Sequence, residues 1–111
     1  MEISKELLSE VYNFDIKDII LLGTDDVTYE VRFNGLKNGL KYNIINIYEL
    51  AHKCKEWALS KECELLSCIR DENTSLCDIY SDVLDCKFTH YANTEPEAIF
   101  KACEWILKEL K

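Results

Sequence analysis

The stretch TEPEAIFKACEWILKELK, residues 94–111, decides how this chain folds. Thr94 is followed by Glu97 in the spacing of a capping box, in which the two side chains satisfy free backbone N–H groups at the start of a helix. Pro96 falls in the first turn, where its missing N–H group costs little. The stretch therefore predicts a helix capped by Thr94.

The charge pattern of this predicted helix indicates deep burial. Apolar residues and a cysteine fill nearly all positions between the charged ones, so most of the helix circumference is expected to contact a core. Phe100 and Trp105 are predicted to be core aromatics, because large aromatic side chains are usually buried. The polar strip, at helical spacing, consists of Glu97, Lys101, Glu104, Lys108 and Lys111.

Two further segments show helical spacing of apolar residues. Residues 4–12 follow a potential N-cap at Ser4 and predict a short amphipathic helix. A second helix begins at Asn46, where Glu49 completes another capping box. His52 lies off the apolar stripe of this helix, so we expect it at the surface or at the boundary of the core rather than in a ligand site.

The remaining apolar segments indicate strands. Residues 27–33, VTYEVRF, alternate strictly between apolar and polar, which is typical of a half-buried strand. Residues 34–39 hold two Asn-Gly pairs and predict a hairpin loop. The other expected segments are strands at 16–22, 40–45 and 62–70, turns at 23–26 and 71–75, and one or two strands within 76–92.

This element order predicts an α+β domain. We expect one antiparallel sheet of five to six strands and three helices, in the order α-β-β-β-α-β-β(-β)-α, with the helices packed on one face. Residues 1–111 would form a single domain, in which an α-β-β-α unit at 44–110 follows an N-terminal helix and a β-meander.

Composition narrows the class of protein. An apolar fraction of 48% excludes intrinsic disorder, and the net charge of −8 makes a nucleic acid backbone an unfavourable partner. The acidity has two interpretations, solubility alone or a face for a basic protein surface. The candidate partner-binding residues are the clustered acidic ones, Asp25, Asp26, Asp71, Glu72, Asp78, Asp82 and Asp85.

Catalytic and cofactor motifs are missing from the sequence. There is no glycine-rich phosphate loop, no G-x-S-x-G and no H-E-x-x-H. No C-x2-C pair appears, so the sequence predicts no metal and no cofactor, and we expect the cysteines to be free thiols in small apolar sites. These are Cys54, Cys63, Cys68, Cys77, Cys86 and Cys103.

The expected compartment is the cytoplasm. The longest aliphatic run, Ile19 to Leu22, is far too short to span a membrane, and the opening MEISKELL lacks the apolar core of a signal peptide. We therefore expect no membrane partner.

The second half of the chain resembles a known family. Residues 44–110, with YELAHKCKEWAL and the ending NTEPEAIFKACEWILKE, are similar to the phage α-β-β-α sandwich domain and to small phage and prophage proteins. The T-x-x-x-A-I-x-x-A ending typical of that family is matched by Thr94, Ala98, Ile99 and Ala102. The first 43 residues depart from it. The resemblance implies a phage origin and a non-enzymatic role, and it carries over no catalytic residue.

Three functional hypotheses follow from the sequence. The first is a phage accessory protein that binds a host or phage protein, including inhibition of a host defence system as anti-CRISPR proteins do. The second is a metal- or thiol-dependent enzyme that uses the Cys/His set. The third is a self-assembling structural component, and the sequence leaves open whether the chain forms a homodimer.

Overall fold

The computed structural model describes residues 3–13, 19–24, 28–33, 43–82 and 86–110. It is an α+β structure with three helices, which confirms that part of the prediction. Six strands are seen in the described residues. The elements are α1 (Lys5–Tyr12), β1 (Ile19–Thr24), β2 (Thr28–Phe33), β3 (Asn43–Asn46), α2 (Ile47–Ser60), β4 (Glu64–Asp71), β5 (Thr74–Ser81), β6 (Cys86–Ala92) and α3 (Glu95–Glu109).

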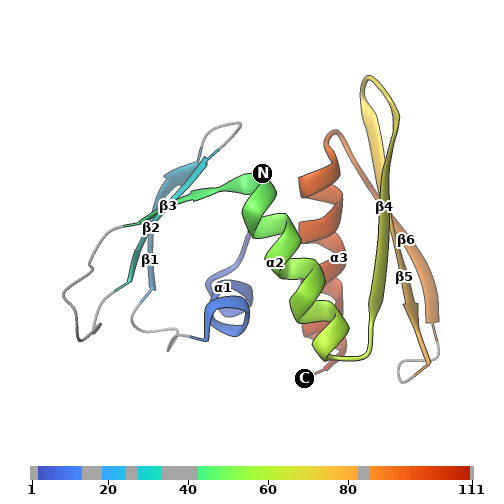
Figure 1. Ribbon diagram of the computed structural model, residues 1–111, viewed down its shortest axis with the longest axis horizontal. Helices are drawn as coiled ribbons and strands as arrows, with labels where there is room; N and C mark the ends of the chain where they lie inside the picture. The colour runs from blue at the N-terminus through green and yellow to red at the C-terminus, as the bar shows by residue number, and fades with distance from the viewer. Residues whose placement is uncertain (1–2, 14–18, 25–27, 34–42, 83–85, 111) are drawn as a thin grey trace.

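The strands form two antiparallel sheets of three strands each, in the orders β1-β2-β3 and β4-β5-β6. The prediction of one sheet with helices on one face was therefore wrong. Asn46 ends β3 and is also the N-cap of α2, so the chain passes directly from the first sheet into a helix. The helices lie between the two sheets (Figure 1). Apolar alternation identifies strands but does not say which strands pair, and that choice is made by tertiary packing.

The predicted N-caps are confirmed at all three helices. Ser4 Oγ accepts a hydrogen bond from the backbone N–H of Leu7 at 3.1 Å. Asn46 Oδ1 accepts from two backbone N–H groups of α2, and Thr94 Oγ1 accepts from that of Glu97 at 3.3 Å. Each cap satisfies donors that the first turn of a helix leaves free, which fixes where each helix begins.

The turns and loops differ in part from the prediction. Gly23 and Thr24 belong to strand β1 rather than to a turn. The turn predicted at 71–75 is tighter, because Asp71 ends β4 and Thr74 begins β5; Asp71 Oδ1 accepts a hydrogen bond from the Asn73 N–H at 2.9 Å. The predicted loop at 34–39 and the starts of two predicted strands, 16–18 and 40–42, lie outside the described residues.

Helix α3 lies at the centre of the core. Phe100 and Cys103 are buried, and α3 packs against α2 and all three strands of the sheet β4-β5-β6. The Cys103 thiol donates to the backbone carbonyl of Cys54 on α2 at 3.5 Å. These short side chains allow the two helices to approach closely, which aligns their larger apolar neighbours with one common core.

Trp105 differs from the expected core aromatic. It is only partly buried, and its ring stacks on Phe88 of β6 with centroids 5.3 Å apart and planes 7° from parallel. Phe88 remains 46% exposed, so the stacked pair closes the side of the core where β6 forms the edge of the sheet. The prediction of core aromatics is thus correct for Phe100 and wrong in part for Trp105.

Glu104 is not a solvent-facing member of the predicted polar strip. Its Oε1 accepts a hydrogen bond from the backbone N–H of Ser4 at 2.8 Å, and its Oε2 accepts from Ser4 Oγ at 3.0 Å. The carboxylate therefore lies at the N-terminus of α1, where the helix dipole favours negative charge. This contact joins α1 to α3, although Ser4 and Glu104 are 100 residues apart in the sequence.

We predict that Glu104→Ala destabilises the protein by about 1.5–3 kcal/mol, because hydrogen bonds to a charged group are lost and a partly buried donor is left unsatisfied. Chemical denaturation followed by circular dichroism measures the change. Glu109→Ala, which removes an exposed carboxylate from the same helix, is the matched control and should change stability by less than about 0.5 kcal/mol. Equal effects of the two substitutions would contradict the assignment.

Candidate functional site

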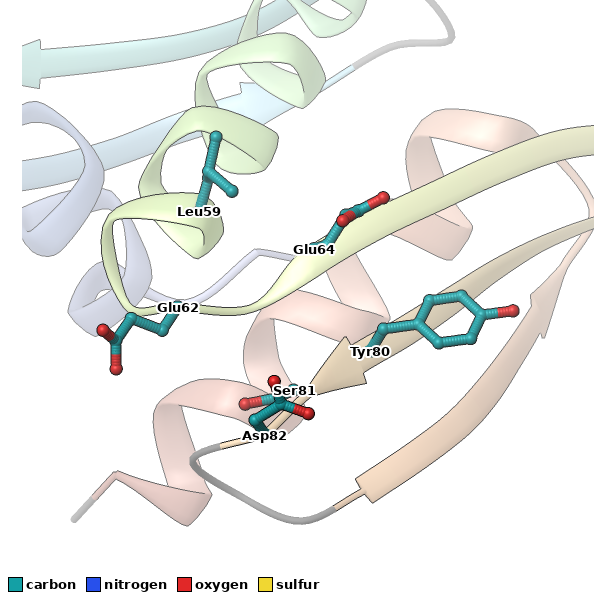
Figure 2. Close-up of a pocket in the computed structure, with 6 residues that line it drawn as sticks. All are labelled: Leu59, Glu62, Glu64, Tyr80, Ser81 and Asp82. Atoms are coloured by element: carbon teal, nitrogen blue, oxygen red, sulfur yellow. The ribbon is translucent and has the colours of Figure 1, made fainter.

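A shallow recess of about 400 Å³ lies where α2 ends and β4 begins (Figure 2). Its described lining comes from the α2–β4 junction and the adjoining end of β5. Three of the lining side chains are carboxylates, and none of the described lining residues is basic. The lining consists of Leu59, Glu62, Glu64, Tyr80, Ser81 and Asp82.

The end of α2 fixes the position of two of these carboxylates. The backbone N–H of Glu62 donates to the carbonyl of Leu59 at 2.9 Å, and that of Cys63 donates to the carbonyl of Ala58 at 2.9 Å. This pair of bonds is a Schellman motif, and Glu62 occupies its left-handed position with φ of 62°. Cys63 is fully buried directly after it, so Glu62 and Glu64 are held at the surface on either side of an anchored residue.

Glutamate is an unfavourable residue at that backbone position. Glycine is the usual residue there, because a side chain in the left-handed region costs on the order of 1 kcal/mol. A strained residue at the wall of a recess points to a role for its side chain beyond the fold. Here the side chain supplies one of the three carboxylates.

The side chains in the recess spread along it rather than converge on one point. Figure 2 shows the three carboxylates apart from one another, with Glu62 at the left, Asp82 below and Glu64 above, and Tyr80 comes from β5, where it is the cross-strand partner of Glu64. Leu59, 64% exposed, adds an apolar surface beside them. Within the described part of the chain, no three His, Cys, Asp or Glu side chains gather in a group that could hold a metal ion.

Among the described residues, the candidates predicted from the sequence do not form one surface. Asp82 lies in the recess, whereas Asp71 and Glu72 lie in a smaller groove of about 190 Å³ near the start of α3. Asp78 is half-buried and accepts a hydrogen bond from Thr89 of the neighbouring strand. Asp25, Asp26 and Asp85 lie outside the described residues.

Sequence reasoning missed Glu62 and Glu64, because it placed both within a predicted strand. A usable signal was present at the end of the α2 pattern, where no glycine follows the helix. About a third to a half of helices end with a left-handed residue, so at a helix end without glycine another residue can take that conformation, as Glu62 does here.

One cysteine and one histidine lie side by side on the sheet. Cys77 of β5 and His90 of β6 are cross-strand partners on the face toward the helices. Burial raises the pKa of the Cys77 thiol to about 12, with Lys55 opposing this shift and Asp78 and Glu95 adding to it. Burial, with a smaller effect of Lys101, lowers the pKa of His90. Both groups are therefore favoured in their neutral forms, unlike the thiolate–imidazolium pair of an activated nucleophile.

The other described thiols are also free. Cys54, Cys63 and Cys103 are buried, and Cys68 is exposed on β4. Hydrogen bonding to Cys54, followed by burial, raises the pKa of Cys103 well above its usual value. Thiolate character is thus suppressed at both Cys77 and Cys103.

His52 is exposed, as expected, and its Nε2 lies 3.3 Å from Glu56 on the next turn of α2. In the part of the chain that the structure describes, no helix combines the length and apolar character needed to cross a bilayer.

Comparison of the chain with known protein families, with curated proteins and with solved structures finds no match.

We predict that His90 makes stability depend on pH. Its folded pKa is depressed, so the unfolded chain binds the proton more readily, and stability falls as the pH drops from about 6.5 toward the folded pKa. Denaturation midpoints measured between neutral and mildly acidic pH test this. His90→Gln should flatten the dependence relative to wild type. A profile unaffected by His90→Gln would refute the prediction.

Thiol labelling of the native protein should be selective. Among the five cysteines just described, Cys68 should react first with a maleimide, because it is exposed while the others are buried. Cys77 and Cys103 should react only after unfolding, since burial limits access and their raised pKa values disfavour the thiolate. Peptide mass mapping over time measures the order. Labelling of Cys77 as fast as Cys68 would be inconsistent with this core.

Proposed function

We propose that the protein acts without catalysis, by binding a basic segment of another protein at the acidic recess. The observation that carries the proposal is the left-handed Glu62, which places a carboxylate where the fold alone favours glycine. With Glu64 and Asp82 it gives the recess three negative charges along a shallow surface.

The chemistry of the recess suits lysine and arginine side chains. Their charged ends can form charge-assisted hydrogen bonds with the separated carboxylates, while their aliphatic stems lie against Leu59. Tyr80 adds an aromatic ring, which attracts cations over its face. Because the carboxylates are spread out, a segment with more than one basic residue fits better than a single small cation.

The charge of the whole chain supports the same kind of partner. A net charge of −8 speeds the approach of a basic protein surface and repels nucleic acid phosphates. Binding of this kind should weaken as salt rises, since exposed charges are screened over about 10 Å at 0.1 M ionic strength. Asp71 and Glu72 at the β4–β5 turn would add to the steering without belonging to the recess.

A thiol-dependent enzyme has weaker support. Cys77 and His90 are neighbours, but burial raises the pKa of one group and lowers that of the other, so neither is prepared for nucleophilic attack. The binding proposal uses no such activation.

The proposed setting is that of a phage or prophage accessory protein in the cytoplasm of a bacterial host. This part of the proposal rests on the sequence resemblance of residues 44–110 to the phage α-β-β-α sandwich domain. Defence proteins that process nucleic acids carry basic grooves, so inhibition of such a protein is the proposed outcome of binding.

The sharpest test is Glu62→Gly. Glycine relieves the strained backbone and should stabilise the protein by about 0.5–1 kcal/mol, yet it removes a carboxylate and should weaken partner binding. Stability is measured by chemical denaturation, and binding by quantitative affinity capture from lysate of the bacterial host at low and high salt.

Asn13→Gly is the matched control, because Asn13 is the left-handed residue that follows α1, with φ of 58°, and it lies outside the recess. It should leave binding unchanged. Capture of the same proteins in the same amounts by wild type and Glu62→Gly would overturn the proposed site. Direct binding of wild type to duplex DNA at physiological salt would overturn the proposed class of partner.

A further inference from the structure

Strand β4 is the edge of its sheet. β5 pairs with one side of it, and no described strand pairs with the other. Its pairing with β5 is regular from Glu64 to Ile69, and Arg70 lies at the register shift between Ile69 and Asp71. Leu66 and Ile69 are 50% and 72% exposed. An edge strand with exposed apolar side chains can pair with a further strand, and most proteins avoid such edges.

The sequence of β4 is complementary to itself. In ELLSCIR, residues 64–70, an antiparallel second copy centred on Ser67 places Glu64 opposite Arg70 of that copy, and Arg70 opposite its Glu64. The apolar residues match in the same register, Leu65 with Ile69 and Leu66 with Cys68. Opposite charges and apolar pairs directly across antiparallel strands are both stabilising.

Ser67 lies at the centre of this register. Its Oγ is inaccessible to solvent and has no hydrogen-bond partner among the described residues. Residues directly opposite each other in an antiparallel pair have Cβ atoms about 5 Å apart, which lets two serine hydroxyls bond across the axis. Because Ser67 Oγ is covered within the single chain, its side chain would have to rotate outward to make this bond, and the rotation would then satisfy a polar atom that the single chain leaves unsatisfied.

We propose that two copies of this chain form a two-fold symmetric dimer by antiparallel pairing of their β4 strands. The two sheets β4-β5-β6 then join into one continuous sheet of twice the width, with Ser67 of both copies at the axis. The opposite edge offers no such match, because β6 reads CKFTHYA and holds a lysine but no carboxylate. Charge complementarity thus selects β4.

The dimer rests on different observations from the proposed partner binding, but the two share Glu64, which lines the recess and lies on β4. Pairing of Glu64 with Arg70 of the second copy leaves Glu62 and Asp82 of each recess for a partner. The two recesses then lie on one assembly, related by the two-fold axis, which gives a partner with two basic segments an advantage through multivalency.

Sedimentation equilibrium over about three decades of protein concentration tests the dimer by mass action. Wild type should show a concentration-dependent dimer. Glu64→Arg and Arg70→Glu should each raise the dimer dissociation constant about tenfold or more, because both symmetric pairs then face like charges. Circular dichroism establishes that each variant is folded.

The decisive experiment is sedimentation equilibrium of a mixture of the two single variants. In a heterodimer of Glu64→Arg with Arg70→Glu, every charged pair across the axis is again opposite in sign, so association should return to within about threefold of wild type. Glu64→Arg also reduces the net negative charge of the chain, so a non-specific effect would strengthen association instead of weakening it. Glu72→Arg, with the same change in charge at the β4–β5 turn, is the control and should leave the dimer intact.

Three results would overturn the proposal: wild type that stays monomeric at every concentration, single variants that associate like wild type, or a mixture that fails to recover association. Loss of partner capture by Glu62→Gly with an intact dimer, or the reverse, separates the two proposals from each other.

Discussion

The packing of α3 against α2 and the sheet β4-β5-β6 is the contact on which the rest of this structure depends. It brings Cys103 onto the backbone of Cys54 and buries Phe100, so two helices and a sheet share one core. The N-terminal helix joins that core through Glu104, whose carboxylate binds the backbone and hydroxyl of Ser4. The first sheet reaches the core through Ile45, which is buried, and through the direct passage from β3 into α2.

The positions of both proposed sites depend on this core of α2, α3 and the sheet β4-β5-β6. Cys63 is buried at the end of α2, which fixes the turn that carries Glu62 and starts β4 beside it. The inner face of β4 packs on the helices through Leu65, and its outer edge is left as the boundary of the sheet. The acidic recess and the self-complementary strand are therefore neighbours, and Glu64 belongs to both. A chain of this size can present two interaction surfaces because one core holds them in a fixed relation.

The sequence predicts the local structure better than the assembly of its parts. Caps at Ser4, Asn46 and Thr94 are encoded by side chains that bond backbone within three residues, so the helix starts follow from local chemistry. Which strands share a sheet depends on contacts between distant segments. The prediction of a single sheet was therefore wrong, and the strands form two sheets. Glu104 shows the same limit, because its place in a charged stripe gave no sign of a partner at Ser4. The site depended on a backbone angle at Glu62, and charge clustering alone found only Asp82 of its three carboxylates.

Native-state hydrogen exchange of α3 tests most directly the claim that this helix holds the structure together. If it does, the amides from Ala102 to Leu107 should exchange only by global unfolding, with a free energy equal to that from chemical denaturation. The slowest amides of β5 should share that value, since both elements line the same core. Exchange of the α3 amides through a low-energy local opening, while β5 stays protected, would contradict the account.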